Sequence, residues 1–139
     1  KIFILDEKGS PITDEDLAYI LAFLAIRTQP RKDVAFPVYM PRVFEEGLRH
    51  YGGNVVWTKS SDRAIMETST RNHIVFASDG EGGAIFPQFQ FTYDGMFGFA
   101  KLLEFLSIEN IPLSQLKDLV PPYSLVKSRV SCPWNTKVE

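Results

Sequence analysis

Hydrophobic positions in this chain recur at helical spacing in two long segments. In residues 14–27 apolar side chains return at i, i+3, i+4, i+7 and i+8, which predicts a helix with one buried stripe. Thr13 is its expected N-cap, and three acidic residues follow in the first turn, where the helix dipole favours negative charge. Residues 95–107 follow an Asp94–Gly95 cap and are apolar on most sides, which is typical of a helix buried between layers or against another domain. One face of this second helix consists of Met96, Phe99, Ala100, Leu103 and Leu106.

Weaker helical patterns and short apolar runs fill the rest of the chain. Three shorter helices are expected from Pro41 to Gly53, from Ser60 or Ser61 to Thr70, and from Pro112 to about Leu119. Strands are expected at Ile2–Leu5, Asp33–Val38, Asn54–Lys59 and Asn72–Ala77, with a short returning strand at Ala84–Phe86. Because strands and helices alternate, the chain predicts a layered α/β domain with a largely parallel sheet.

The composition fits one folded domain and excludes several classes of partner. The chain has 139 residues, 45% of them hydrophobic, with 11 phenylalanines, which is enough to fill a core without a metal or a disulfide. Its net charge is −2 and it has no cluster of Lys and Arg, which argues against nucleic acid as a partner. No apolar run is long enough to span a membrane, the longest candidate being Leu17–Ile26, so we expect no membrane partner.

Cysteine and histidine are too few for a metal site or an internal disulfide. Cys132 is the single cysteine, and only His50 and His73 accompany it as further soft ligands. This cysteine usage leads us to expect a cytoplasmic protein. The chain begins with Lys1 rather than Met, inside a predicted strand, so we also expect it to be a piece of a longer protein.

The segment after the strand predicted at 72–77 carries the clearest candidate chemistry. Asp79, Gly80, Glu81, Gly82 and Gly83 form a glycine-rich acidic turn between two apolar runs. The glycines permit positive φ and the close approach of a ligand, and the two carboxylates can accept hydrogen bonds from the hydroxyl groups of a polyol. The local pattern alone favours the simpler alternative, an ordinary β-hairpin with charged turn residues.

A second turn with candidate chemistry follows the strand predicted at 54–59. Ligands of parallel sheets bind at the carboxyl ends of the strands, so this turn and the acidic turn lie on the edge that ligands favour. Lys59 and Arg63 offer donors there to a phosphate or a sugar. The alternative for both is the solvated start of a helix, and for Arg63 the two interpretations have equal weight.

Several segments occur in an order that matches a known domain. Arg42–Ile65 has a helix, a strand and a turn, and Thr58–Arg63 fits the pattern Thr-x-x-Gly-Asp-Arg with Ser61 in place of glycine. Further along the chain come Asp79–Ile85, Asp94-Gly95 with Ala100–Leu106, Pro112–Leu116 and Cys132–Trp134. Together these segments resemble the third domain of the α-D-phosphohexomutases, the family of phosphomannomutases and phosphoglucomutases. They are most similar to the mutase-like half of fusion proteins labelled mannose-1-phosphate guanylyltransferase-like.

The resemblance carries expectations for fold, domains and site. It implies a three-layer α/β/α fold with a mixed, mostly parallel four-stranded sheet. Residues 1–12 would be the tail of the second mutase domain, 13–120 the third domain, and 121–139 the linker into the fourth. The third domain would bind a hexose phosphate, of mannose or glucose, beside the other mutase domains of the same chain. The corresponding substrate-binding candidates here are Asp79, Gly80, Glu81, Gly82, Gly83, Lys59 and Arg63.

Two loops of the intact family are missing from this chain. The family's phosphoserine loop lies in the first domain, and its Asp-Gly-Asp-x-Asp-Arg loop, which holds Mg²⁺, lies in the second. The resemblance therefore implies Mg²⁺ in the intact enzyme but no cofactor, catalytic residue or metal ligand in this chain. We expect the chain alone to have no mutase activity.

The acidic turn departs from the family's sugar-recognition loop, Gly-Glu-x-Ser-Gly-His-Ile. With Ile85 aligned, the family's Glu falls on Gly80, its Ser on Gly82 and its His on Ala84. Glu81, one place later, is the only glutamate in the turn. Either the loop recognises sugar differently, or recognition has been lost. In the second case the chain is a non-catalytic, mutase-like module that regulates or assembles a sugar nucleotidyltransferase of the mannose-1-phosphate guanylyltransferase type.

Overall fold

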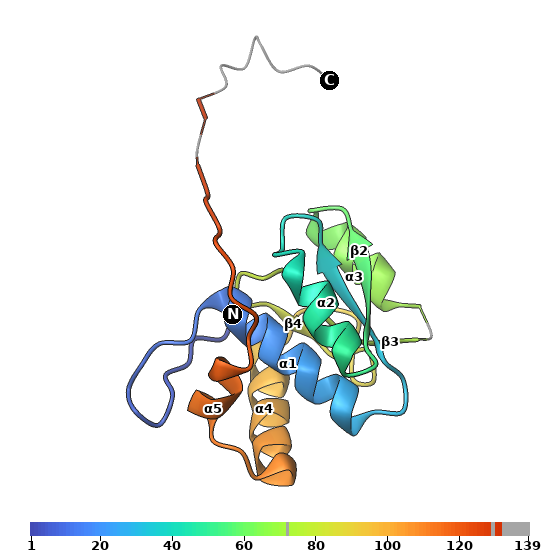
Figure 1. The fold of residues 1–139 in the computed structure, drawn as a ribbon. Coiled ribbons are helices and arrows are strands. Elements are labelled where there is room, and N and C mark those ends of the chain that lie inside the picture. The colour runs from blue at the N-terminus through green and yellow to red at the C-terminus, as the bar shows by residue number, and fades with distance from the viewer. Residues whose placement is uncertain (72, 129, 132–139) are drawn as a thin grey trace.

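The structure is a computed structural model that describes residues 1–71, 73–128 and 130–131. Helices and strands alternate along the chain, as the hydrophobic pattern predicts (Figure 1). The helices are α1 (Asp14–Thr28), α2 (Val43–His50), α3 (Asp62–Ser69), α4 (Gly95–Glu109) and α5 (Leu113–Asp118). The strands are β1 (Asp33–Pro37), β2 (Asn54–Thr58), β3 (Ile74–Ser78) and β4 (Ala84–Ile85). The predicted linker motif Cys132–Trp134 and the predicted strand start at Asn72 lie outside the described residues.

The four strands form one mixed sheet in the order β2-β1-β3-β4. β1 pairs in parallel with both β2 and β3, whereas the short β4 returns antiparallel to β3. The prediction of a strand at Ile2–Leu5 was wrong, since this segment makes only an isolated antiparallel bridge between Leu5 and Pro11. Ile2 is instead buried, and its N–H donates to the Gly82 carbonyl at 2.9 Å. β4 therefore supplies the fourth strand of the sheet.

Helices cover both faces of the sheet, which gives the three layers expected. Successive side chains of a strand point to opposite faces, and β1 shows the consequence clearly. Val34 and Phe36 pack into the larger apolar cluster with α1 and α2, whereas Ala35 packs with Ile65 of α3. Burying a side chain of the size of Phe36 contributes about 2 kcal/mol, so this alternation fixes which face each helix takes.

Helix α1 is the centre of the larger layer. Every residue from Asp16 to Ile26 is buried, because α1 contacts β1, β3, α2, α4 and α5. The prediction of one buried stripe was therefore wrong, and small residues explain how neighbours approach on the other sides. Ala18, Ala22 and Ala25 lie between the larger apolar side chains and are all fully or almost fully buried.

Helix α4 buries a different face from the one that its apolar spacing indicated. Met96 is 85% exposed and Leu103 52% exposed, whereas Leu102 and Phe105 face the core. The helix starts at its N-cap Asp94, whose carboxylate accepts from the N–H of Phe97 at 2.8 Å. The Phe-rich pattern located the helix but did not define its inner face.

Candidate functional site

The carboxyl ends of the parallel strands meet at one edge of the sheet. The register places Pro37 of β1 beside Thr58 of β2, and Ala35 of β1 beside Ala77 of β3. Neighbouring strands lie about 4.8 Å apart, so the segments that follow β1, β2 and β3 are close neighbours. This carboxyl edge carries the predicted sugar loop, Asp79–Gly83, together with Lys59.

The sugar loop is closed by its own hydrogen bonds. One carboxylate oxygen of Asp79 accepts from the N–H groups of Glu81 and Gly83, each at 2.8 Å. The hydroxyl of Ser78 donates to the Gly83 carbonyl at 2.6 Å and accepts from the N–H of Gly80 at 3.0 Å. The carboxylate of Asp79 therefore holds the turn in shape, because its Oδ1 is already engaged within the loop.

Two of the three loop glycines have the positive φ that the sequence predicts. Gly80 has φ 67° and Gly82 has φ 86°. A Cβ on Gly80 would lie 2.1 Å from the sulfur of Met40, and one on Gly82 would lie 2.9 Å from the Ile2 carbonyl. The close approach that these glycines permit is thus to the protein's own residues, and both are buried.

Glu81 is the exposed acidic residue of the loop. Its charge raises the pKa of residues in other segments of the chain. The pKa of Lys1 is raised, first by its hydrogen bond and ion pair with Asp14 and further by Glu81 and Asp79. Because the Glu81 N–H is tied to Asp79 while its side chain faces solvent, the carboxylate is presented on a fixed backbone.

Two tyrosines, which the sequence reasoning missed, complete the edge. The Tyr39 hydroxyl donates to the Asp79 carbonyl at 2.6 Å, and the Tyr93 hydroxyl donates to the Asp62 carboxylate at 3.3 Å. Burial, followed by the charges of Glu81 and Asp79, raises the pKa of Tyr39 to about 12. Burial also raises the pKa of Tyr93, with Asp79 and Asp62 adding to the effect. Tyr39 comes two residues after the end of β1, so its position after a parallel strand was the available indication.

The two predicted basic candidates differ in their contacts. Lys59 is exposed on the turn after β2, on the carboxyl edge. Arg63 lies in the first turn of α3, and its guanidinium pairs with Glu67 one turn later at 2.7 Å. The structure therefore brings Asp62, rather than Arg63, to the sugar loop through Tyr93.

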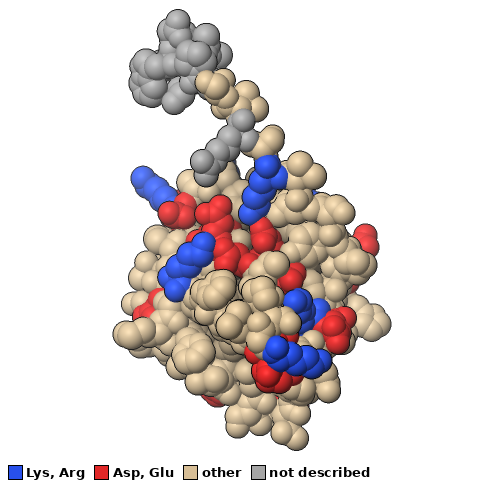
Figure 2. All heavy atoms as spheres, turned by 90° about the vertical axis from the view of Figure 1, so that its left-hand side faces the viewer, with Lys and Arg blue, Asp and Glu red and all other residues tan. Residues whose placement is uncertain are grey.

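Acidic side chains dominate this end of the molecule, and Figure 2 shows them gathered near the point where the C-terminal segment leaves the body. They share the edge with two lysines, Lys1 on Asp14 at 2.9 Å and Lys127 on Glu15 at 2.6 Å. A carboxylate-rich edge accepts hydrogen bonds from hydroxyl or ammonium groups and repels phosphate. The edge therefore suits the sugar ring better than the phosphate of a sugar phosphate.

Within the part of the chain that the structure describes, no group of three or more His, Cys, Asp or Glu side chains could hold a metal ion. The described residues thus do not fit the Mg²⁺ of the phosphohexomutases. Over the same residues, no helix has both the length and the apolar character that crossing a membrane requires.

Comparison with known families decides what this domain is. Residues 13–123 match the family profile described as phosphoglucomutase/phosphomannomutase, alpha/beta/alpha domain III. The chain belongs to this family. The resemblance found in the sequence is thereby confirmed, while its particular likeness to guanylyltransferase fusions stays a prediction.

Curated relatives align with the whole of this domain III chain. A probable phosphoglucosamine mutase of Thermococcus kodakarensis is 27% identical over 139 residues, covering 100% of this chain and 31% of the relative. The phosphoglucosamine mutase of Methanococcus maripaludis is 30% identical over 139 residues, covering 99% of this chain and 31% of the relative. The chain therefore spans about a third of the length of these relatives.

Solved structures confirm the fold of the domain. A putative phosphomannomutase from Thermus thermophilus superposes with a TM-score of 0.76 at 16% identity, covering 84% of this chain and 26% of the other. A phosphoglucomutase/phosphomannomutase family protein from Burkholderia thailandensis gives a TM-score of 0.72 at 19% identity, covering 86% of this chain and 26% of the other. The expected α/β class with a mixed, mostly parallel sheet is thus confirmed.

Proposed function

We propose that this chain is the sugar-recognising domain III of an α-D-phosphohexomutase, which converts hexose 6-phosphates to hexose 1-phosphates. The observation that carries the proposal is the exposed carboxylate of Glu81 on a loop closed by Asp79 at the carboxyl edge. Glu81 accepts hydrogen bonds from sugar hydroxyls, and Lys59 lies on the same sheet edge, after β2. Because the loop is already hydrogen-bonded, little ordering is needed when the sugar binds.

The acidic character of the edge favours a hexose that carries an ammonium group. After burial, the charges of Glu81, Asp79 and Asp62 each help to raise the pKa of Tyr39, so all three carboxylates lie near the Tyr39 hydroxyl. A protonated amino group at the sugar's C2 would meet these carboxylates favourably, whereas the neutral hydroxyl of mannose or glucose would gain only a hydrogen bond. This supports glucosamine phosphate as a substrate beside mannose and glucose phosphates, and the curated relatives are named for glucosamine.

The chain would act together with the other mutase domains of a cytoplasmic enzyme. It would be preceded by the second domain, whose tail is residues 1–12, and followed by the fourth domain after residues 121–139. Those domains would supply the phosphoserine, the Mg²⁺ site and the binding site for the non-reacting phosphate. The chain alone would therefore bind sugar phosphates weakly and would not interconvert them.

An amide NMR titration of the chain tests this proposal. Glucosamine 6-phosphate should move the amides of residues 79–84, and glucose 6-phosphate and mannose 6-phosphate should move them less. Glu81→Gln should abolish these shifts without changing the rest of the spectrum. Glu46→Gln, an exposed acid on α2, is the matched control and should leave the shifts intact. Loop amides that ignored all three sugar phosphates would overturn the proposal.

A second candidate, a non-catalytic module of a sugar nucleotidyltransferase, is favoured by one observation. The positions where the family carries Ser and His are Gly82 and Ala84, and both are buried against the protein. Under this alternative the loop is structural, and no sugar phosphate shifts its amides. The titration therefore separates the two candidates directly.

A further inference from the structure

A cavity of about 420 Å³ opens at the amino ends of β1 and β3, the sheet edge opposite the sugar loop. Three connecting segments line it, namely the α1–β1 connection, the α3–β3 connection and the loop after β4. Its volume lies within the range of small-molecule sites, about 300 to 1,000 Å³. Nothing in the proposed sugar recognition uses this cavity, which we call the amino-edge cavity.

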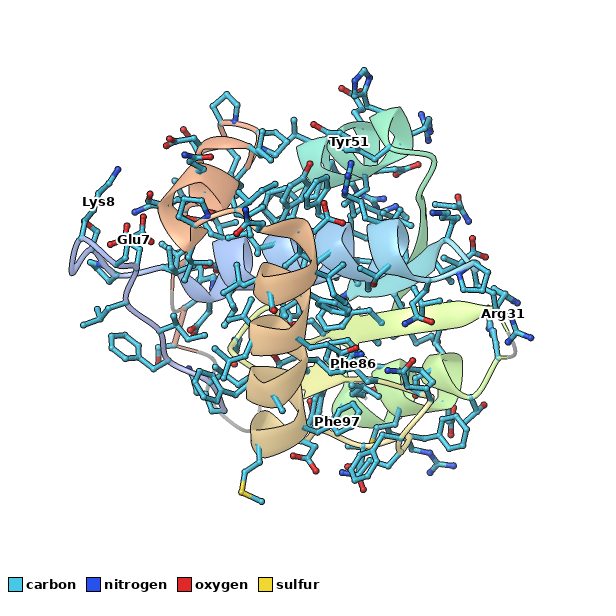
Figure 3. All side chains as sticks on the ribbon, turned by 90° about the horizontal axis from the view of Figure 1, so that it is seen from below. Glu7, Lys8, Arg31, Tyr51, Phe86 and Phe97 are labelled. Atoms are coloured by element: carbon cyan, nitrogen blue, oxygen red, sulfur yellow. The ribbon has the colours of Figure 1, made fainter. Side chains whose placement is uncertain are left out.

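Two arginines from different connections face the amino-edge cavity. Arg31 comes from the α1–β1 connection and Arg71 from the α3–β3 connection. Figure 3 shows Arg31 at this end of the molecule, beyond the end of α1. Among residues 1–71, 73–128 and 130–131, neither guanidinium forms an ion pair, unlike Arg27, which pairs with Glu109 at 2.9 Å. Guanidinium groups donate charge-assisted hydrogen bonds to phosphate, so two of them lining one cavity suit a phosphate group.

The positions of Arg31 and Arg71 have a second explanation, the attraction of cations to helix C-termini. α1 and α3 both end at this edge, and the partial negative charge at a helix C-terminus attracts nearby cations. That attraction falls off within the last turn of a helix, and Arg31 lies beyond the cap residue Gln29. An arginine kept only for a helix end would stabilise the fold without binding a ligand, which an experiment can distinguish.

The rest of the lining fits the organic part of a phosphate ester. Phe91 is 51% exposed and presents a ring at the mouth, and Pro30 and Pro87 add apolar surface. Gln29 and Gln88 provide amide donors and acceptors for hydroxyl or carbonyl groups. Inorganic phosphate would use the arginines alone and leave the aromatic and apolar wall uncovered.

We propose that the amino-edge cavity binds a small phosphate ester whose ring lies against Phe91 while its phosphate pairs with Arg31 and Arg71. Two sources share this chemistry, a nucleoside monophosphate and a sugar phosphate. The proposal stands independently of the sugar loop, because the two sites lie on opposite edges of the sheet.

Amide NMR and calorimetric titrations of the intact chain test the proposal with three probes: inorganic phosphate, uridine monophosphate and glucosamine 6-phosphate. At least one ester should shift the amides of Gln29, Arg31 and residues 70–71 and 88–91 and bind more tightly than inorganic phosphate. A preference for uridine monophosphate assigns the source as nucleotide, and a preference for glucosamine 6-phosphate assigns it as sugar. Shifts confined to residues 79–84 would support the sugar loop and overturn the amino-edge site.

Matched variants separate ligand binding from helix-end stabilisation. The double variant Arg31→Gln/Arg71→Gln should weaken binding of the ester about tenfold or more, since it removes two charge-assisted contacts. The control Lys8→Gln/Arg49→Gln removes the same charge from exposed positions elsewhere and should leave binding unchanged. Phe91→Ala should weaken the ester but not inorganic phosphate. No saturable binding of either ester by the unmodified chain, or equal loss in both double variants, would overturn the proposal.

Discussion

The two edges of the sheet differ in charge and in how completely the protein fills them. The carboxyl edge is acidic and closed, with the sugar loop tied to Tyr39 and to residues near the N-terminus. The amino edge is basic and holds an open cavity. Helix direction explains much of the difference, because N-termini of the helices point to the carboxyl edge and favour acids there. The first turns of α1, α2 and α3 all carry acidic residues, and the last turns of α1 and α2 carry basic ones.

What helix ends do not explain is more informative. Asp79 and Glu81 belong to the loop between β3 and β4 and not to a helix, and Asp79 has a clear structural task. Glu81 remains as an acid without one. At the opposite edge, Arg27 is matched by Glu109, whereas Arg31 and Arg71 face a cavity. The residues left over after this comparison are the ones proposed to bind ligands.

The largest effect is expected where the closed edge is packed most tightly. Gly82→Ala should lower the free energy of unfolding by about 3 kcal/mol, since a left-handed φ and a crowded Cβ each cost about 1 to 2 kcal/mol. Gly52→Ala is the matched control, with φ 80° but nothing within 4 Å of its Cβ, and should cost about 1 kcal/mol. Urea denaturation measures both. Equal losses would mean that the contacts of Gly82 with Lys1 and Ile2 do not close the edge.

A smaller loss is expected from Asp79→Ala, which removes the acceptor of two backbone hydrogen bonds. The free energy of unfolding, measured by urea denaturation, should fall by about 1 to 2 kcal/mol, because two loop N–H groups lose their hydrogen-bond acceptor. Asp79→Asn keeps one acceptor oxygen and should recover more than half of the loss. If both variants matched the unmodified chain, the sugar loop would not depend on its internal hydrogen bonds.

High pH should loosen the closed edge further. Burial raises the pKa of Tyr39 to about 12 from its ordinary value, so folding favours the neutral phenol. Its contribution is fully present below about pH 10, where tyrosine in the unfolded chain is also neutral, and is lost as the pH rises towards 12.

Comparing the unmodified chain with Tyr39→Phe tests this pH dependence. The difference in urea midpoint between the two proteins should shrink as the pH rises from about 10 towards about 12, since Tyr39 ionises more readily in the unfolded chain than in the folded one. Tyr19→Phe is no substitute, because Tyr19 also has a pKa raised to about 12 but lies in the core. A difference that stayed constant over this range would show that the surroundings of Tyr39 do not favour its neutral phenol.

The smallest effect on stability is expected at the open edge. Arg71→Ala should change the free energy of unfolding by no more than about 0.5 kcal/mol, because Arg71 is exposed and packs on no ion-pair partner among the described residues. Thermal unfolding in buffer without phosphate measures it. A loss comparable to that of Asp79→Ala would assign Arg71 to the end of α3 and remove the contrast between the edges.

The sequence predicted the elements of the fold better than their environments. Four of the five predicted strands and all five helices are present, because their spacing and caps act locally, as Thr13 shows by accepting from the N–H of Asp16. The strand predicted at Ile2–Leu5 is absent because a short apolar run can also be buried as an irregular segment, here with Ile2 against Gly98 of α4. Which sides of α1 and α4 are buried depends on the elements that pack against them. The apolar spacing within a helix does not reveal those tertiary neighbours.

The sequence predicted where the candidate residues lie on the sheet better than it predicted their contacts. The sugar loop and Lys59 lie on the carboxyl edge because that placement follows from strand direction alone. The partners of Asp79 and Arg63 depend on side-chain geometry, and so does the arrival of Tyr93 from a distant loop. The amino-edge cavity is lined by three connecting segments that are far apart in sequence, so no local motif predicts it.

One segment, residues 86–94, touches both edges. It is anchored by the buried ring of Phe86 and by the cap residue Asp94. Between these anchors Phe91 lines the amino-edge cavity, and the Tyr93 ring lies beside Gly83 of the sugar loop. If both proposed ligands bind and each changes the order of this segment, each alters the affinity of the other by the same factor. The size of that factor would measure how far a single stretch of backbone makes one cooperative unit of two opposite surfaces.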